Sequence, residues 1–125
     1  MRDDDRFNKG LEVRTAVMGE ARVRSSLLGE DDLAYELQQL TTKIAWGEIW
    51  TREGLDRRSR SIMTVAMLIA LNRSAELKAH MIGAINNGLT VAELQEMIIH
   101  SAIYCGFPAA LEAMRMLRLV ADDCA

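Results

Sequence analysis

One predicted helix ends and the next begins within the stretch Asn86–Glu93, which reads NNGLTVAE. Gly88 predicts the end of the first helix, because glycine adopts a left-handed backbone conformation without the steric penalty of a Cβ atom. Thr90 and Glu93 have the T-x-x-E spacing of a capping box, in which each side chain accepts a hydrogen bond from the backbone of the other residue. The stretch therefore predicts two helices joined by a short turn.

The sequence on both sides of this turn has helical periodicity, and nothing in it alternates convincingly at the period of two that strands require. Downstream, the helix is expected to stop near Gly106, and Pro108 suits the first turn of another helix. Upstream, Ser74 is expected to cap the helix that ends at Gly88, and Asp56 is expected to cap one more helix. The helix after Asp56 is apolar on nearly all sides over residues 62–71, which predicts that it is the central helix.

The N-terminal part predicts two further helices, making six in all. The first covers about residues 6–18 and closes at Gly19, while the second opens at an aspartate, residue 31 or 32, and runs to about Trp46. The segment from Trp46 to Gly54 holds both tryptophans and is predicted to be a connection. The expected fold class is all-α, with residues 1–125 forming a single compact domain.

Composition supports a packed core and gives little sign of a polyanionic partner. Hydrophobic residues make up 50% of the chain and charged residues 26%, a balance that argues against disorder. This apolar share is generous for 125 residues, so a homo-oligomer that buries part of it is expected. The net charge is -3 without a dense cluster of Lys or Arg, which argues against nucleic-acid binding.

The sequence favours a cytoplasmic protein without a membrane segment. The charged N-terminus is not followed by the apolar segment of a secretory signal, and the most apolar stretch, residues 62–71, is half as long as the roughly twenty residues that span a bilayer. The two cysteines, Cys105 and Cys124, have neither CxxC nor metal-finger spacing. Both are expected to be reduced thiols.

Two histidines are the first candidates for chemistry. His80 and His100 each follow a glutamate, Glu76 and Glu96, by four residues, which places each pair on one face of a helix. The alternative is that each pair merely stabilises its helix. A metal site requires the two pairs to converge, and no tighter ligand motif supports one, so no metal is predicted.

Arginines and tryptophans are the candidates for binding a small organic anion. A guanidinium group matches a carboxylate bidentately, although each arginine can equally be solvated or paired with a local acid. Trp46 and Trp50 lie four residues apart and can contact a ligand or form a packed aromatic pair. The arginines near this segment and at both ends of the apolar helix are Arg52, Arg57, Arg58, Arg60 and Arg73.

Five motifs are spread along most of the chain. They are Arg6-Phe7-x-x-Gly10-x-x-x-Arg14, Trp46-Gly47-Glu48-Ile49-Trp50-Thr51-Arg52-x-Gly54-Leu55-Asp56-Arg57-Arg58, Asn72-Arg73-x-x-Glu76-Leu77-x-x-His80, Gly83-Ala84-x-Asn86-Asn87-Gly88-x-Thr90 and His100-x-Ala102-x-Tyr104-Cys105-Gly106-Phe107-Pro108-Ala109-Ala110. Together these motifs resemble the 4-carboxymuconolactone decarboxylases, from about Phe7 to Arg118. The resemblance implies an all-α fold shared with alkylhydroperoxidase D-like proteins and a hexamer built as a trimer of dimers.

The resemblance also implies an activity, the cofactor-free decarboxylation of 4-carboxymuconolactone to 3-oxoadipate enol-lactone in the protocatechuate branch of the β-ketoadipate pathway. His80 is then the expected general acid, and Glu48 orients it or relays its proton, with Glu76 as the alternative partner. Arg58 or Arg73 is expected to bind the acetate carboxylate of the substrate.

Two other functions are weighed against this activity. Alkylhydroperoxidase D-like proteins carry a CxxC pair ahead of the histidine, where this chain has Arg73 and Glu76, so a redox protein has to rely on Cys105 alone. A non-catalytic oligomer that binds small organic anions is the second alternative.

Overall fold

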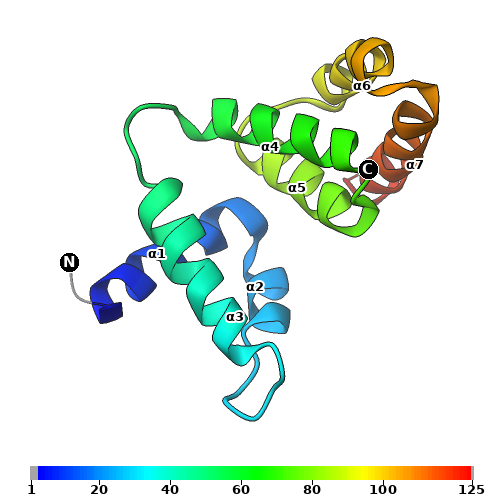
Figure 1. Ribbon diagram of the computed structural model, residues 1–125. Coiled ribbons are helices and arrows are strands. Elements are labelled where there is room, and N and C mark those ends of the chain that lie inside the picture. The colour runs from blue at the N-terminus through cyan, green and yellow to red at the C-terminus, as the bar shows by residue number, and fades with distance from the viewer. Residues whose placement is uncertain (1–2, 125) are drawn as a thin grey trace. The chain divides into compact units, whose positions relative to one another are not determined.

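The computed structural model describes residues 3–124 and divides the chain into two compact units, Met1–Asp56 and Arg57–Ala125. Every regular element in the described part of the chain is a helix, which confirms the all-α prediction (Figure 1). None of these helices is both long enough and apolar enough to cross a bilayer. The single-domain expectation stays a prediction, and the thiol of Cys124 lies outside the described side chains.

The first unit contains three α-helices and a π-helix (Figure 1). Gly19, with φ of +91°, separates the first two helices and confirms the predicted end of the first. Met18 and Val23, on either side of this break, are both buried. The elements are α1 (Asp3–Met18), α2 (Glu20–Ser26), α3 (Tyr35–Leu40) and η1 (Thr41–Ile49).

The second predicted helix is wrong at both ends. Asp32 accepts a hydrogen bond from the backbone N–H of Ala34 at 2.9 Å, but this contact lies in a turn before α3. The helix then continues through η1 to Ile49, so the predicted connection from Trp46 to Gly54 is helical in its first part. Gly47 does not break the helix, because its missing side chain serves a close contact with α1 instead.

Two glycines allow α1 and η1 to pack closely. A Cβ atom at Gly10 would lie 2.0 Å from the backbone oxygen of Thr42, and one at Gly47 would lie 2.5 Å from the backbone oxygen of Arg6. The guanidinium group of Arg14, which is 9% exposed, donates to Thr42 Oγ1 at 3.0 Å and to Gln38 Oε1 at 2.8 Å. Backbone contact and buried polar bonds therefore join α1 to the segment formed by α3 and η1.

The second unit contains four α-helices whose boundaries are close to the predicted ones (Figure 1). Gly88 and Gly106 have positive φ angles and end the second and third of these helices. Thr90 and Glu93 form the predicted capping box, and Pro108 lies in the first turn of the last helix. The helices are α4 (Arg57–Leu71), α5 (Ser74–Asn86), α6 (Val91–Cys105) and α7 (Phe107–Cys124).

Ser74 does not cap α5, contrary to prediction. It is the first residue of the helix, and the residue at the cap position is Arg73. The Ser74 hydroxyl instead donates to Glu112 Oε2 of α7 at 2.5 Å, a tertiary partner that replaces the local backbone. This bond connects the beginning of α5 to α7.

The core of the second unit forms where all four helices meet. The helix α4 contributes Val65 and Ile69 to it, while Met63, Met67 and Leu71 are at least half exposed. The predicted central helix therefore buries only one face in this chain. The largest fully buried side chains of the cluster are Ile69, Leu77, Met81, Leu94, Ile98, Val65 and Val120.

Candidate active site

The predicted site residues are divided between the two units. The first unit holds Glu48, Trp46 and Trp50, and the second holds His80 together with the two candidate arginines, Arg58 and Arg73.

Trp46 and Glu48 lie in the last turns of η1, and Trp50 directly follows its last residue. The carboxylate of Glu48 lies 2.9 Å from Nε of Arg6 on α1, and its side chain is 43% exposed. Trp46 is buried, and Trp50 stacks on it with ring centroids 4.7 Å apart and planes inclined by 27°. This stacking is the packed aromatic pair that the sequence analysis gave as the alternative. Glu48, rather than Trp46, has the exposure that contact with a ligand requires.

His80 lies near the middle of α5 and is half-buried. Its neighbours Ala79 and Met81 are both buried, whereas Glu76, one turn earlier, is exposed. The other pair differs: His100 is exposed and its ring lies against Tyr104, with centroids 5.1 Å apart.

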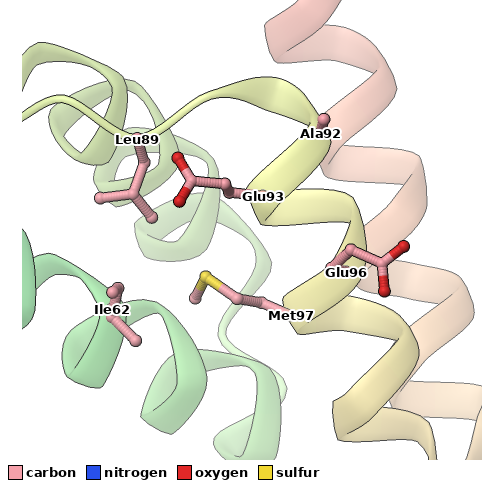
Figure 2. Close-up of a pocket in the computed structure, with 6 residues that line it drawn as sticks. All are labelled: Ile62, Leu89, Ala92, Glu93, Glu96 and Met97. Carbon is pink, nitrogen blue, oxygen red and sulfur yellow. The ribbon is translucent and has the colours of Figure 1, made fainter.

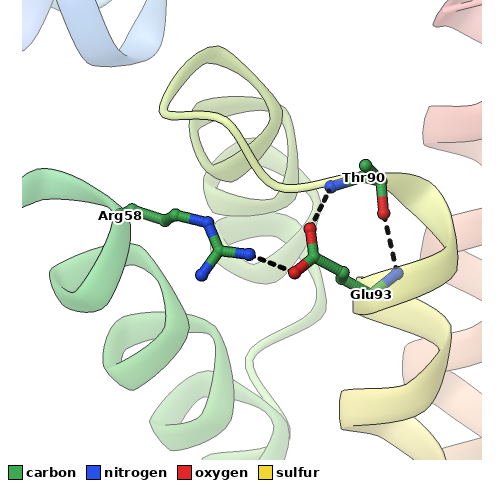
Figure 3. A network of polar contacts seen from close by, with 3 residues as sticks. All are labelled: Arg58, Thr90 and Glu93. Atoms are coloured by element: carbon green, nitrogen blue, oxygen red, sulfur yellow. Dashed lines mark hydrogen bonds and ion pairs between the residues drawn. The ribbon is translucent and has the colours of Figure 1, made fainter.

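Arg58 forms an ion pair that the sequence analysis did not anticipate. Its guanidinium group, in the first turn of α4, donates to Glu93 Oε2 of α6. Glu93 also closes the capping box, accepting from Thr90 N at 3.1 Å through Oε1 (Figure 3). The bond from Arg58 and then that from the Thr90 backbone lower the pKa of Glu93. The capping-box motif was visible in the sequence, but its partner 35 residues earlier was not.

Arg73, the second candidate for substrate binding, precedes α5 and has an exposed side chain. Its backbone is engaged at the start of the helix, where its carbonyl oxygen accepts from Leu77 N at 2.8 Å and its N–H donates to Leu68 O at 3.1 Å. The backbone of Arg73 is thus fixed by hydrogen bonds, while its side chain is exposed. An exposed guanidinium group suits the recognition of a carboxylate.

An apolar cavity of about 360 Å³ lies beside the Arg58–Glu93 pair and shares Glu93 with it. Ligand pockets in proteins have volumes of about 300 to 1,000 Å³. The carboxylate of Glu93 points toward Leu89, whereas that of Glu96 points away from Ile62 and Met97 (Figure 2). The sequence analysis did not single out this set. The residues that line the cavity are Ile62, Leu89, Ala92, Glu93, Glu96 and Met97.

Among the described residues, no three His, Cys, Asp or Glu side chains gather closely enough to hold a metal ion. Cys105, the candidate thiol of the redox alternative, is a free, partly buried cysteine at the end of α6.

Residues 35–119 match the Carboxymuconolactone decarboxylase family. The chain belongs to this family. This member of the carboxymuconolactone decarboxylase family is 45% identical to the 4-carboxymuconolactone decarboxylase of Acinetobacter baylyi, over 98% of this chain and 92% of that protein. It is also 39% identical to a nitrosuccinic acid decarboxylase of Metarhizium robertsii, over 94% of this chain and 82% of that protein.

These comparisons confirm the resemblance drawn from the sequence motifs. Both relatives are decarboxylases, and their identity to this carboxymuconolactone decarboxylase family member extends over nearly all of its length. The protein is therefore a carboxy-lyase.

Proposed function

We propose that this decarboxylase converts 4-carboxymuconolactone into 3-oxoadipate enol-lactone, in the protocatechuate branch of the β-ketoadipate pathway. The observation that carries the proposal is the 45% identity to the Acinetobacter baylyi enzyme over almost the full length of both chains. The remaining steps of the proposal follow from the chemistry of the substrate and from the residues available.

The substrate carries its own electron sink. One carbon of its unsaturated lactone ring bears both the carboxylate to be lost and an acetate arm. When the bond to that carboxylate breaks, carbon dioxide leaves and the electron pair moves through the ring double bond onto the lactone carbonyl oxygen. A proton added to the carbon beside that carbonyl gives the enol-lactone. The protein has to stabilise the oxyanion and deliver one proton, tasks that hydrogen-bond donors and a general acid perform without a cofactor.

His80 is the proposed general acid. An imidazole has an ordinary pKa of about 6.5, which suits proton delivery near neutral pH, and a placed acid contributes about 10² to 10⁴ in rate. The half-burial of His80 supports this role, since the exposed His100 shares the same Glu-x-x-x-His spacing without that shelter. Glu48 is proposed to act with His80, as orienting group or proton relay.

The acetate carboxylate is proposed to bind to Arg58 or Arg73. Arg73 has an exposed side chain on a hydrogen-bonded backbone, whereas Arg58 has to exchange its contact with Glu93 for one with the ligand. Trp50, the less buried member of the stacked pair, is the more accessible of the two proposed aromatic contacts. An apolar environment beside the departing carboxylate favours its loss as neutral carbon dioxide, and most residues that line the cavity beside Glu93 are apolar.

Nitrosuccinate is a second candidate substrate, because the chain is 39% identical to the nitrosuccinic acid decarboxylase of Metarhizium robertsii. The two molecules share a substructure: one carbon carries the departing carboxylate, a CH₂-carboxylate arm and an electron sink. In nitrosuccinate the sink is the nitro group, which takes up the electron pair as a nitronate before the carbon is protonated. A site that holds the arm and supplies one proton serves both reactions.

The enzyme is proposed to act in the cytoplasm as a homo-oligomer, with the hexameric trimer of dimers that the family resemblance implies. The apolar surface of the second unit supports an assembly. An apolar groove of about 300 Å³ runs between α6 and α7. At its sides Ile103 is 74% exposed, Phe107 66% and Leu111 69%. Adjacent exposed side chains of this size commonly mark an interaction surface.

Turnover of both substrates by the wild type and by two matched histidine variants tests the proposal. Carbon dioxide release and enol-lactone formation are followed without added cofactor. His80→Ala is expected to lower kcat by about 10² or more, while His100→Ala, which removes the other histidine of the same spacing, stays within about threefold of wild type. Near-normal turnover by His80→Ala removes His80 from the chemistry. Activity on nitrosuccinate alone reassigns the substrate.

A further inference from the structure

One face of α1 follows the course of η1 through residues spaced four apart, Arg6, Gly10 and Arg14. Arg6 contacts η1 at Glu48, Gly10 lies against the backbone of Thr42 and Gly47, and Arg14 donates to Thr42 and to Gln38 just before η1. The pairing runs from the end of η1 back toward its beginning as α1 advances, so the two helices are antiparallel. Arg6 is the member of this face that contacts a proposed active-site residue.

The backbone around this contact leaves little freedom. A Cβ atom at Gly47 would lie 2.5 Å from the backbone oxygen of Arg6 and 3.1 Å from its Cγ atom. The arginine stem therefore lies directly against the residue before Glu48. Helices in such close contact cannot slide past each other without a clash, and this fixes the position of Arg6 relative to Glu48.

The side chains complete the arrangement. Nε of Arg6 lies 2.9 Å from Oε1 of Glu48, and the two side chains are 30% and 43% exposed. A glutamate side chain has several rotatable bonds, and restricting them before the substrate arrives removes an entropic cost from the reaction. Glu48 thus has a preset position and enough exposure to reach a ligand.

We propose that Arg6 is a positioning residue of the decarboxylase, holding the Glu48 carboxylate in its working orientation. This inference rests on the proposed function of Glu48. A second ion pair on α1 provides the contrast: Lys9 and Glu12 are joined at 3.7 Å within a single helix turn, and their side chains are 48% and 71% exposed. That pair neither crosses to η1 nor touches a proposed active-site residue.

Arg6→Gln tests the inference most directly, because glutamine keeps the Cγ atom that packs against Gly47 and removes the charged group. It is expected to lower kcat by about tenfold to a hundredfold and to leave KM within about twofold of wild type, since displacement of a reacting group costs up to about 10² in rate. Arg6→Lys, which keeps the charge, is expected to restore part of kcat. The matched control, Lys9→Ala, is expected to be fully active.

A double-mutant cycle with Glu48→Gln separates positioning from a direct role. If Arg6 acts through Glu48, adding Arg6→Gln to Glu48→Gln lowers kcat by less than about twofold further. Multiplicative losses in the cycle, or a rise in KM without loss of kcat, overturn the inference, because Arg6 then contacts the substrate itself. If the wild type is active and Arg6→Gln has the same kcat, the inference about Arg6 is overturned while the proposed function stands. A wild type inactive on both substrates overturns the proposed function, and the inference falls with it.

Discussion

Replacing Gly10 with alanine should destabilise the protein, although alanine is the better helix former. The added Cβ atom would lie 2.0 Å from the backbone oxygen of Thr42, where ordinary contacts begin at 3.4 Å. The shortfall is about 1.4 Å and involves backbone atoms, so α1 and η1 have to move apart. Overpacking of this kind costs about 1 to 3 kcal/mol and occasionally more, while the gain in helix propensity is about 1 kcal/mol. An approach of 2.0 Å to a backbone atom puts the cost at the upper end of this range, about 3 kcal/mol, so we expect a net loss of about 2 kcal/mol in unfolding free energy.

Urea unfolding followed by circular dichroism, at one fixed protein concentration, measures this loss. With a denaturant slope of about 2 kcal/mol per molar, the midpoint should fall by about 1 M. Gly54→Ala is the matched control, because no heavy atom lies within 4 Å of the Cβ position there, and its midpoint should hardly move. If Gly10→Ala unfolds at the same or a higher urea concentration than wild type, the added Cβ atom meets no clash that exceeds the gain in helix propensity. That outcome contradicts the close packing of α1 on η1.

Two further predictions concern the second unit. Hydrogen bonds from Arg115 and then Ser74 lower the pKa of Glu112 from its ordinary value of 4.5 to about 2, so the stability it contributes is present above pH 4.5 and is lost as the pH falls toward 2. Glu112→Gln should therefore lose less stability than wild type between pH 5 and pH 2.5 in urea unfolding; equal losses contradict the assignment. Thr90→Ala should cost about 1 kcal/mol of unfolding free energy through loss of the cap, while Thr90→Ser stays near wild type.

Local signals predicted most of the second unit correctly. The capping box of Thr90 and Glu93, the glycine at position 88 and the proline at position 108 act over a few residues, and the structure has helix ends where they indicate. Ser74 shows the limit of this reasoning. A serine at the beginning of a helix is a good cap by propensity, but Glu112, 38 residues later in the chain, takes its hydroxyl hydrogen bond. A local preference yields to a tertiary partner that the sequence does not display.

The segment around the tryptophans was predicted less well for a related reason. A glycine can indicate either a break in a helix or the close approach of another backbone, and the sequence around Gly47 does not distinguish the two. The structure has the close approach, to Arg6. Both ion pairs of the candidate site were missed for the same reason, because they join residues far apart in the sequence. Glu48 and Arg58 were named from the sequence, but their contacts with Arg6 and Glu93 depend on how distant helices pack.

The contact between Arg58 and Glu93 has a consequence for how a dicarboxylate substrate binds. A carboxylate that approaches Arg58 has to compete with Glu93, whose charge the capping box also supports. Both side chains of this pair are 44% exposed, and ion pairs with such exposure contribute only about 0 to 1 kcal/mol, so the exchange costs little. If Arg58 binds the acetate arm as proposed, its contact with the substrate is equally weak and leaves the departing carboxylate unclamped. This suits a decarboxylase, because a departing carboxylate bound too tightly in the ground state is lost more slowly.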